Sequence, residues 1–179
     1  MEQINFQKLT PAEKRIAIAR DVIAQLDADK YIAEAGQYCC FRDMDVEMSD
    51  DIKKKFDEEW ICDVCALGGL LVSLTHFNNK YTFQDLDAIS CKEITSPFKE
   101  LAEYFTLSQL FLIEAAFEGW TDFSTGVAHS MDYKPTPEEL ELVEEHADAW
   151  EDNYYNDDRL RKIMKNIIQN GGEFVISDR

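Results

Sequence analysis

The chain has 179 residues, a length typical of one domain, and 45% of them are hydrophobic, which is enough for a real core. Its 36 acidic and 18 basic residues give a net charge of -18, which disfavours direct binding to nucleic-acid phosphates or to anionic membranes. The sequence has no run of about 18 apolar residues and no signal-peptide pattern, so we expect a single acidic domain over residues 1–179, located in the cytoplasm.

Helix-start signals are clear in the first half of the chain. Residues 10–13 combine an N-cap threonine, a proline in the first turn and a glutamate three residues after the cap, with apolar residues following at helical spacing. A short strand is expected over residues 37–41. Residues 61–77 are nearly uncharged and apolar on most sides, which predicts a buried central helix. Its Gly68-Gly69 pair costs about 1 kcal/mol per glycine relative to alanine, which indicates a close helix crossing or a kink.

The second half of the chain repeats these signals. Thr106 and Thr136 each begin a capping sequence, the first followed by a helix that stops at Gly119 and the second by a helix that runs to about Tyr155. A last helix is expected to end before the glycines that follow Asn170. The sequence therefore predicts a mainly α, compact domain of about six to seven helices around the apolar helix 61–77. A minor two-stranded β element would pair residues 37–41 with residues 173–176.

Residues 136–158 are the most distinctive segment, because they contain ten acidic residues and no lysine or arginine. On a helix their apolar residues fall on one stripe, which leaves the acids on the solvent face. Carboxylates three or four residues apart lie about 5 to 6 Å from each other, similar to the phosphate repeat along a nucleic-acid strand. An ordinary solvated helix face is the alternative. The predicted partner-binding residues are Glu138, Glu141, Glu144, Glu145, Asp148, Glu151, Asp152, Asp157 and Asp158.

The five cysteines are odd in number and unevenly spaced, which is more typical of reduced thiols than of a disulfide framework. Cys62 and Cys65 form a Cys-x-x-Cys pair, but the pair opens an apolar helix and has no second close-spaced pair beside it. We therefore expect no cofactor and no metal. A zinc-supported structural domain stays an alternative, in which the further ligands come from Cys39, Cys40, Cys91 and His76.

Catalytic motifs are absent around the three histidines, since none lies in a nucleophile-elbow, zinc-protease or phosphate-loop context. His129 is followed by a serine in an expected loop, so a small enzyme with its active site near His129 stays an alternative. Glu114 and Glu118 could act as a general acid/base pair, but a chain with 36 acids contains such pairs by chance. The sequence favours a role without catalysis.

Four stretches, Ile16–Leu26, Cys62–Ser73, Gln109–Glu118 and Arg159–Phe174, resemble uncharacterised small acidic proteins of phages and prophages. These stretches are helix cores rather than active-site motifs, so the resemblance implies no residue roles. Small acidic phage proteins are often inhibitors of host defence, and some mimic DNA. The resemblance therefore implies a phage protein that acts in the cytoplasm of a host cell.

Charge and resemblance together predict an acidic inhibitor that binds a protein. Its partner would be a basic, nucleic-acid-binding or defence protein of the host, whose basic groove the chain occupies as a DNA or RNA mimic. Such a chain would be an inhibitor of the anti-restriction or anti-CRISPR type. Nucleic acid and membrane are not expected as direct partners.

Overall fold

The computed structural model describes residues 5–36, 38–42, 60–82, 85–86, 96–119, 127–128, 131–151 and 156–176. Six α-helices lie in these ranges: α1 (Pro11–Asp27), α3 (Ala66–Asn78), α5 (Ser96–Leu101), α6 (Leu107–Glu118), α8 (Pro137–Glu151) and α9 (Asn156–Gln169). A 3-10 turn, η1 (Phe6–Lys8), precedes them. None of the helices in the described ranges has the length and apolar character needed to cross a bilayer.

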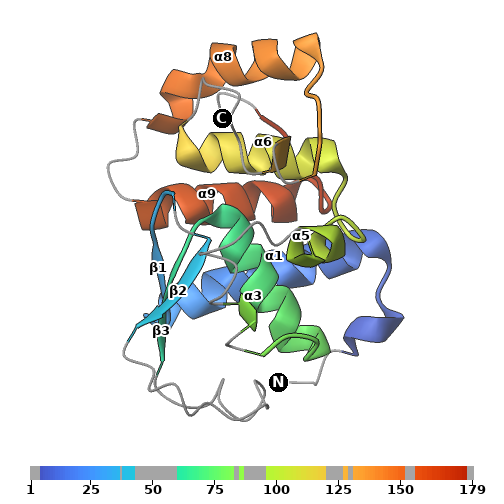
Figure 1. Cartoon of the computed structure of the whole chain (residues 1–179), viewed down its shortest axis with the longest axis vertical. Helices are drawn as coiled ribbons and strands as arrows, with labels where there is room; N and C mark the ends of the chain where they lie inside the picture. The colour runs from blue at the N-terminus through green and yellow to red at the C-terminus, as the bar shows by residue number, and fades with distance from the viewer. Residues whose placement is uncertain are drawn as a thin grey trace.

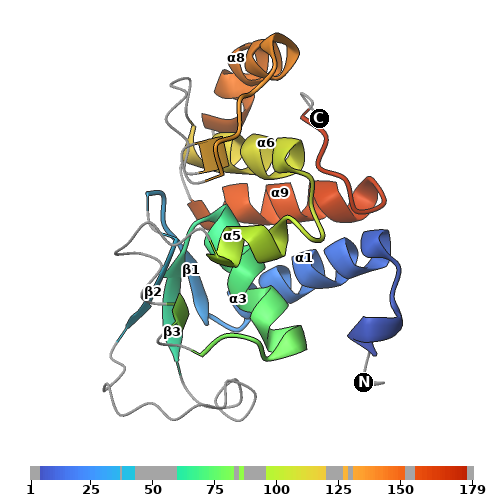
Figure 2. The same ribbon diagram turned by 45° about the vertical axis from the view of Figure 1, so that its right-hand side comes forward.

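The helices are stacked along the long axis of the molecule. Figures 1 and 2 place α8 at one end, with α6, α9 and α1 following in that order, and α8 packs against α6. Helix α3 crosses this stack and contacts α1, α5 and α6. The small sheet lies beside the end of α3 at which that helix begins (Figure 1).

Local capping explains where the helices begin and end, and it confirms those predictions from the sequence. Thr10 and Glu13 form a complete capping box at the start of α1. Thr106 accepts a hydrogen bond from the backbone N–H of Gln109 at the start of α6, and Gly119 ends that helix in the left-handed conformation. Helix α9 ends at Gln169, immediately before the expected stop.

The sheet differs from the predicted two-stranded element and corrects the predicted fold class. Three strands, β1 (Tyr31–Ala33), β2 (Cys39–Arg42) and β3 (Ile61–Val64), are arranged in the order β1-β3-β2. The central strand, β3, pairs parallel with β1 and antiparallel with β2. Residues 61–64 are thus a strand and not the first turn of the central helix, which begins at Ala66. The fold is mainly α with a three-stranded mixed sheet.

The prediction that residues 173–176 pair with residues 37–41 is also wrong. Strand β2, which covers much of the range 37–41, has β3 as its neighbour. Residues 173–176 are extended but lie on helices, where the side chains of Gln109 and Asn166 bind their backbone. Alternating apolar residues indicate an extended backbone, and they do not identify what the backbone pairs with.

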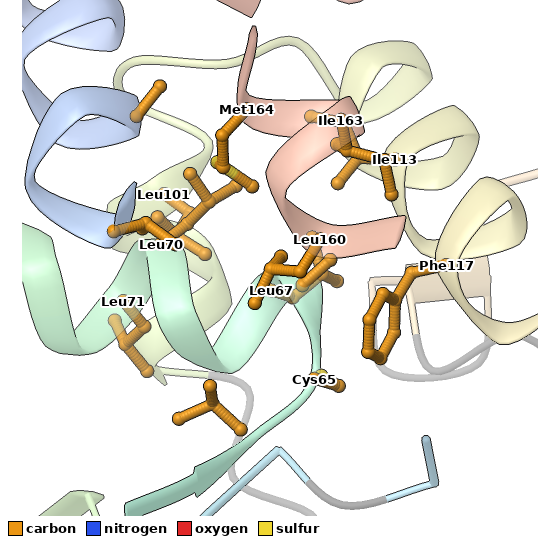
Figure 3. Close-up of a cluster of buried hydrophobic side chains, with 14 of the residues drawn as sticks. Cys65, Leu67, Leu70, Leu71, Leu101, Ile113, Phe117, Leu160, Ile163 and Met164 are labelled. Carbon is orange, nitrogen blue, oxygen red and sulfur yellow. The ribbon is translucent and has the colours of Figure 1, made fainter. Parts of the chain in front are cut away.

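The core lies where α3, α6 and α9 meet. Figure 3 shows Leu67 of α3 close to Leu160 of α9, with Phe117 of α6 to one side of them and Leu70 one turn further along α3. All four side chains are fully buried. Because every residue from Ala66 to Thr75 is buried, α3 is the central helix that its apolar sequence predicts, although it begins later than expected.

Gly68 lets a backbone segment approach α3 very closely. A Cβ atom at this position would lie 1.3 Å from the carbonyl oxygen of Tyr38, so only glycine fits. A Cβ atom at Gly69 would meet nothing closer than the Val22 side chain of α1, at 3.6 Å. The close approach predicted from the Gly68-Gly69 pair is therefore present, but the segment that approaches Gly68 is the chain just before β2 and not a helix.

Candidate partner-binding surface

Helix α8 has one face turned to the protein and one turned to solvent. Val143 is buried, and Leu140 is partly buried against the core. The side chains of Glu138, Glu141, Glu144 and Glu145 are exposed. Leu142, which lies among them in the sequence, is 36% exposed and is one of three large exposed hydrophobic residues in the described ranges. We call Glu138, Glu141, Leu142, Glu144 and Glu145 the acidic face.

Glu139 belongs to the inner side of α8, although it is one of the ten acids in the segment. Its carboxylate accepts hydrogen bonds from the hydroxyl of Tyr133 at 2.7 Å and from the backbone N–H of Thr136 at 2.7 Å. Burial alone would raise the pKa of Glu139, but these bonds and one from Ser108 outweigh it and hold the pKa below its usual value. Glu139 therefore fixes the start of α8 and is not available to a partner.

The structure brings four of the nine predicted partner-binding residues together, namely the four glutamates of the acidic face. Asp148 and Glu151 lie on α8, but their side chains are outside the described part of the structure, as is all of Asp152. Asp157 and Asp158 lie in the first turn of α9, where negative charge is favourable. Asp158 is exposed, whereas Asp157 accepts a hydrogen bond from the backbone N–H of Ala33 at 2.7 Å and ties α9 to β1.

The acidic face lies at one end of the molecule. Helix α6 separates α8 from α9 in both views of the ribbon (Figures 1 and 2). The segment from residue 136 to residue 158 contains no lysine or arginine that could neutralise the glutamates from the same helix. Like charges three or four residues apart repel by a few tenths of a kcal/mol per pair, so this arrangement does not stabilise α8.

A second group of carboxylates lies at the end of α6, where Glu114 and Glu118 come together on one face of the helix. Glu114 is only 2% exposed, and its two oxygens accept hydrogen bonds from the hydroxyl of Tyr38 and from the backbone N–H of Val127, each at 2.9 Å. Glu118 accepts a hydrogen bond from the backbone N–H of Gly36 at 2.7 Å. The two glutamates thus join α6 to the segments around β1 and β2 and to residue 127.

The environment of Glu118 favours its protonated form. The pKa of Glu118 is raised to about 7, chiefly by burial and in smaller part by the nearby Glu114, while the Gly36 hydrogen bond and Arg159 of α9 oppose the rise. Burial also raises the pKa of Tyr38. A carboxyl that titrates near neutral pH could transfer protons, but its bonded partner is a backbone N–H group of the protein itself. We therefore assign this pair a structural role.

The alternative enzyme site near His129 stays a prediction, because His129 lies outside the described residues. A different histidine, His76 of α3, has its Nδ1 atom 3.0 Å from a carboxylate oxygen of Asp21 on α1. The two residues are 55 positions apart. No short motif signals their pairing, so only the packing of α3 on α1 could reveal it.

Three of the four cysteines in the described ranges are buried, and Cys40 is partly exposed. Cys62 lies on β3, and Cys65 caps α3 by accepting a hydrogen bond from the backbone N–H of Gly68. Burial raises the pKa of both thiols, so both are protonated at neutral pH. Within the ranges that the structure describes, no three His, Cys, Asp or Glu side chains are placed to hold a metal ion together. Cys91, a candidate ligand in the zinc alternative, lies outside those ranges.

Comparison with known proteins gives no match to this chain, whether with protein families, with curated proteins or with solved structures.

Proposed function

We propose that this chain is a binding protein whose acidic face docks on a basic surface of a partner protein. The observation that carries the proposal is the composition of that face, in which four exposed glutamates lie beside an exposed leucine at one end of the molecule. Charge complementarity speeds association and selects partners, and an apolar residue inside a polar rim can supply a buried contact. Leu142 would provide that contact.

The partner of this proposal is a nucleic-acid-binding protein. Glu138, Glu141 and Glu145 follow one another at spacings of three and four residues, so their carboxylates form a row along the helix. A groove that holds a phosphate backbone is lined by basic residues and would accept such a row. Occupation of that groove would exclude DNA or RNA, which would make the chain an inhibitor by competition.

Reversing the charge of Glu141 and Glu145 should weaken partner binding by about tenfold or more, because two attractive contacts become repulsive. The full-length protein would be used to capture partners from a nuclease-treated bacterial lysate. The affinity of each captured protein for wild type and for the Glu141→Lys/Glu145→Lys variant would then be measured at low and high salt. Competition with labelled DNA and RNA for the captured protein would test mimicry directly.

The matched control reverses two exposed glutamates away from α8, in the variant Glu34→Lys/Glu103→Lys, which changes the net charge by the same amount. Circular dichroism would verify that both variants are folded. An equal loss of affinity in both variants would mean that overall charge, and not the acidic face, drives binding. Unchanged affinity of the α8 variant for a partner that competes with DNA or RNA would refute the proposal.

A further inference from the structure

Residues Glu173–Ile176 are held as a bound peptide would be, and we call them the clamped segment. They are extended, but helices α6 and α9 take the place of a neighbouring strand. The side-chain amide of Gln109 donates a hydrogen bond to the carbonyl of Phe174 at 2.9 Å and accepts one from its N–H at 2.5 Å. Asn166 binds the carbonyl and the N–H of Val175 in the same way, at 2.8 and 2.9 Å.

The side chains of the clamped segment alternate as they would in a strand on a core. Phe174 is 2% exposed and Ile176 is 9% exposed, whereas Val175 between them is 45% exposed. Within the segment the two amides bind only main-chain atoms, so specificity resides in the sites that bury Phe174 and Ile176. Outside the segment, the Asn166 amide oxygen also accepts a hydrogen bond from the side chain of Asn170 at 3.1 Å. Main-chain bonds combined with sites for alternate side chains are the usual way in which proteins bind extended peptides.

Two glycines connect this segment to α9. Gly171 is exposed, has a φ of +66°, and has open space around the position of a Cβ atom. Gly172 has a φ of +96°, and its carbonyl accepts a hydrogen bond from Arg15 of α1 at 2.7 Å. Arg15 also forms an ion pair with Glu173. Gly171 is therefore an exposed position at which the backbone can change direction. The contacts of Arg15 that follow it hold the segment in place.

We propose that the site formed by Gln109, Asn166 and Arg15 also accepts the clamped segment of a second copy of this chain, by exchange about the connection at residues 170–172. The contacts that Gln109, Asn166 and Arg15 make with the segment are restored in the exchanged pair, since the second copy supplies the same residues. The bonds that must open are those of the turn itself, from the N–H of Gly172 to Ile167 and from the N–H of Glu173 to Asn170. Exchange of an identical element is a low-cost route to a dimer. The chain's own segment competes for this site with the segment of the second copy, at an effective concentration in the millimolar range. Exchange is therefore favoured when the chain's own segment binds the site less tightly.

The test uses two full-length variants, each unable to exchange with itself. The segment variant, Phe174→Ala, retains the site and loses the main buried side chain of the segment. The clamp variant, Gln109→Ala/Asn166→Ala, retains the segment and loses the four amide bonds. We expect a 1:1 complex with twice the 20.7 kDa mass of the chain when the two are mixed, and only monomer from either one alone, by size exclusion with light scattering.

A labelled peptide of residues 172–176, Gly-Glu-Phe-Val-Ile, reports on the site separately. We expect it to bind the segment variant at least tenfold more tightly than the clamp variant, and a peptide with Phe and Val interchanged to bind weakly. If the segment variant is unfolded, Ile176→Ala takes its place. If the clamp variant is unfolded, the single substitution Asn166→Ala takes its place. Peptide binding without a mixed complex would overturn exchange between copies and leave a site for extended peptides. If the variants are folded and show neither peptide binding nor a mixed complex, the whole proposal is overturned.

Discussion

The variant Gly68→Ala is expected to lose at least about 3 kcal/mol of folding free energy, which lowers the melting temperature by at least about 6 °C. The added methyl group would lie 1.3 Å from the carbonyl oxygen and 2.4 Å from the carbonyl carbon of Tyr38. Backbone atoms cannot rotate away as the end of a flexible side chain can, so the chain around Tyr38 must move as a whole.

The displacement of Tyr38 would spread through its contacts. Its hydroxyl binds the buried carboxylate of Glu114, and its ring packs edge-on against Phe98 with the ring centroids 4.9 Å apart. Loss of the hydroxyl would leave one oxygen of Glu114 without this donor in a buried site, which carries its own cost of about 1 to 3 kcal/mol. Gly68→Ala should therefore lose more folding free energy than a substitution that only overpacks a side chain.

The neighbouring glycine provides the control. Gly69→Ala places its methyl group 3.6 Å from Val22 and 3.7 Å from Val64, which is ordinary van der Waals contact. Alanine is a better helix residue than glycine, so this variant should be unchanged or more stable by up to about 1 kcal/mol. Thermal and urea unfolding of both variants beside wild type would decide the matter. Similar stabilities of the two variants would show that Tyr38 does not pack on α3 as described.

The helices with local signals could be predicted from the sequence, and the sheet could not. Caps at Thr10, Thr106 and Thr136 use residues within three positions of the helix start, so they are visible in a short stretch of sequence. Strand β3 is a short apolar run that continues into an apolar helix, and such a run does not by itself distinguish a strand from a helix. Its pairing with β1, about 30 positions away, decides between them.

The acidic residues show the same contrast between what a short stretch of sequence reveals and what only long-range contacts reveal. The sequence indicates that residues 136–158 are acidic on one side, and the structure places four glutamates there as expected. It also shows that Glu139 and Asp157 use their carboxylates to hold the fold, through Thr136 and Ala33 respectively. The contact of Asp157 joins residues 124 positions apart, so no local pattern could separate it from a freely exposed acid.

The Glu114 and Glu118 pair was visible in the sequence as two acids one helical turn apart. Its meaning was not visible, because the groups that bind it come from the segments around β1 and β2 and from residue 127. The two carboxyl groups also differ in how deeply they are buried. Glu114 is enclosed, whereas Glu118 is half-buried near the turn that follows β1.

Glu118 should make the protein less stable as the pH rises from about 4.5 to about 7. Its pKa in the folded chain is about 7, above the ordinary value of 4.5, because burial disfavours the charged form. In that pH range the folded state therefore binds more protons than the unfolded state, so the stabilising contribution of the proton is present at low pH and is lost as the pH rises through 7. Above pH 7 the contribution is constant.

The variant Glu118→Gln removes this titration and keeps an oxygen that can accept the hydrogen bond from Gly36. We expect it to match wild type at pH 5 and to be more stable at pH 8 by about 1 kcal/mol, or about 2 to 4 °C, after allowance for solvent screening of a half-buried group. Glu103→Gln, at an exposed position on the same protein, should show no such difference between the two pH values.

The comparison at two pH values separates this effect from other consequences of the substitution. The groups that face Glu118 are Glu114 on its own helix, Arg159 of α9, and Tyr38 and Cys65 near the sheet. Glu114 raises the pKa of Glu118 and Arg159 lowers it, and burial is the largest cause of the raised pKa. A Glu118→Gln variant that is equally destabilised at pH 5 and pH 8 would show that Glu118 is charged in the folded chain throughout this range and that its contact with Gly36 requires the charge.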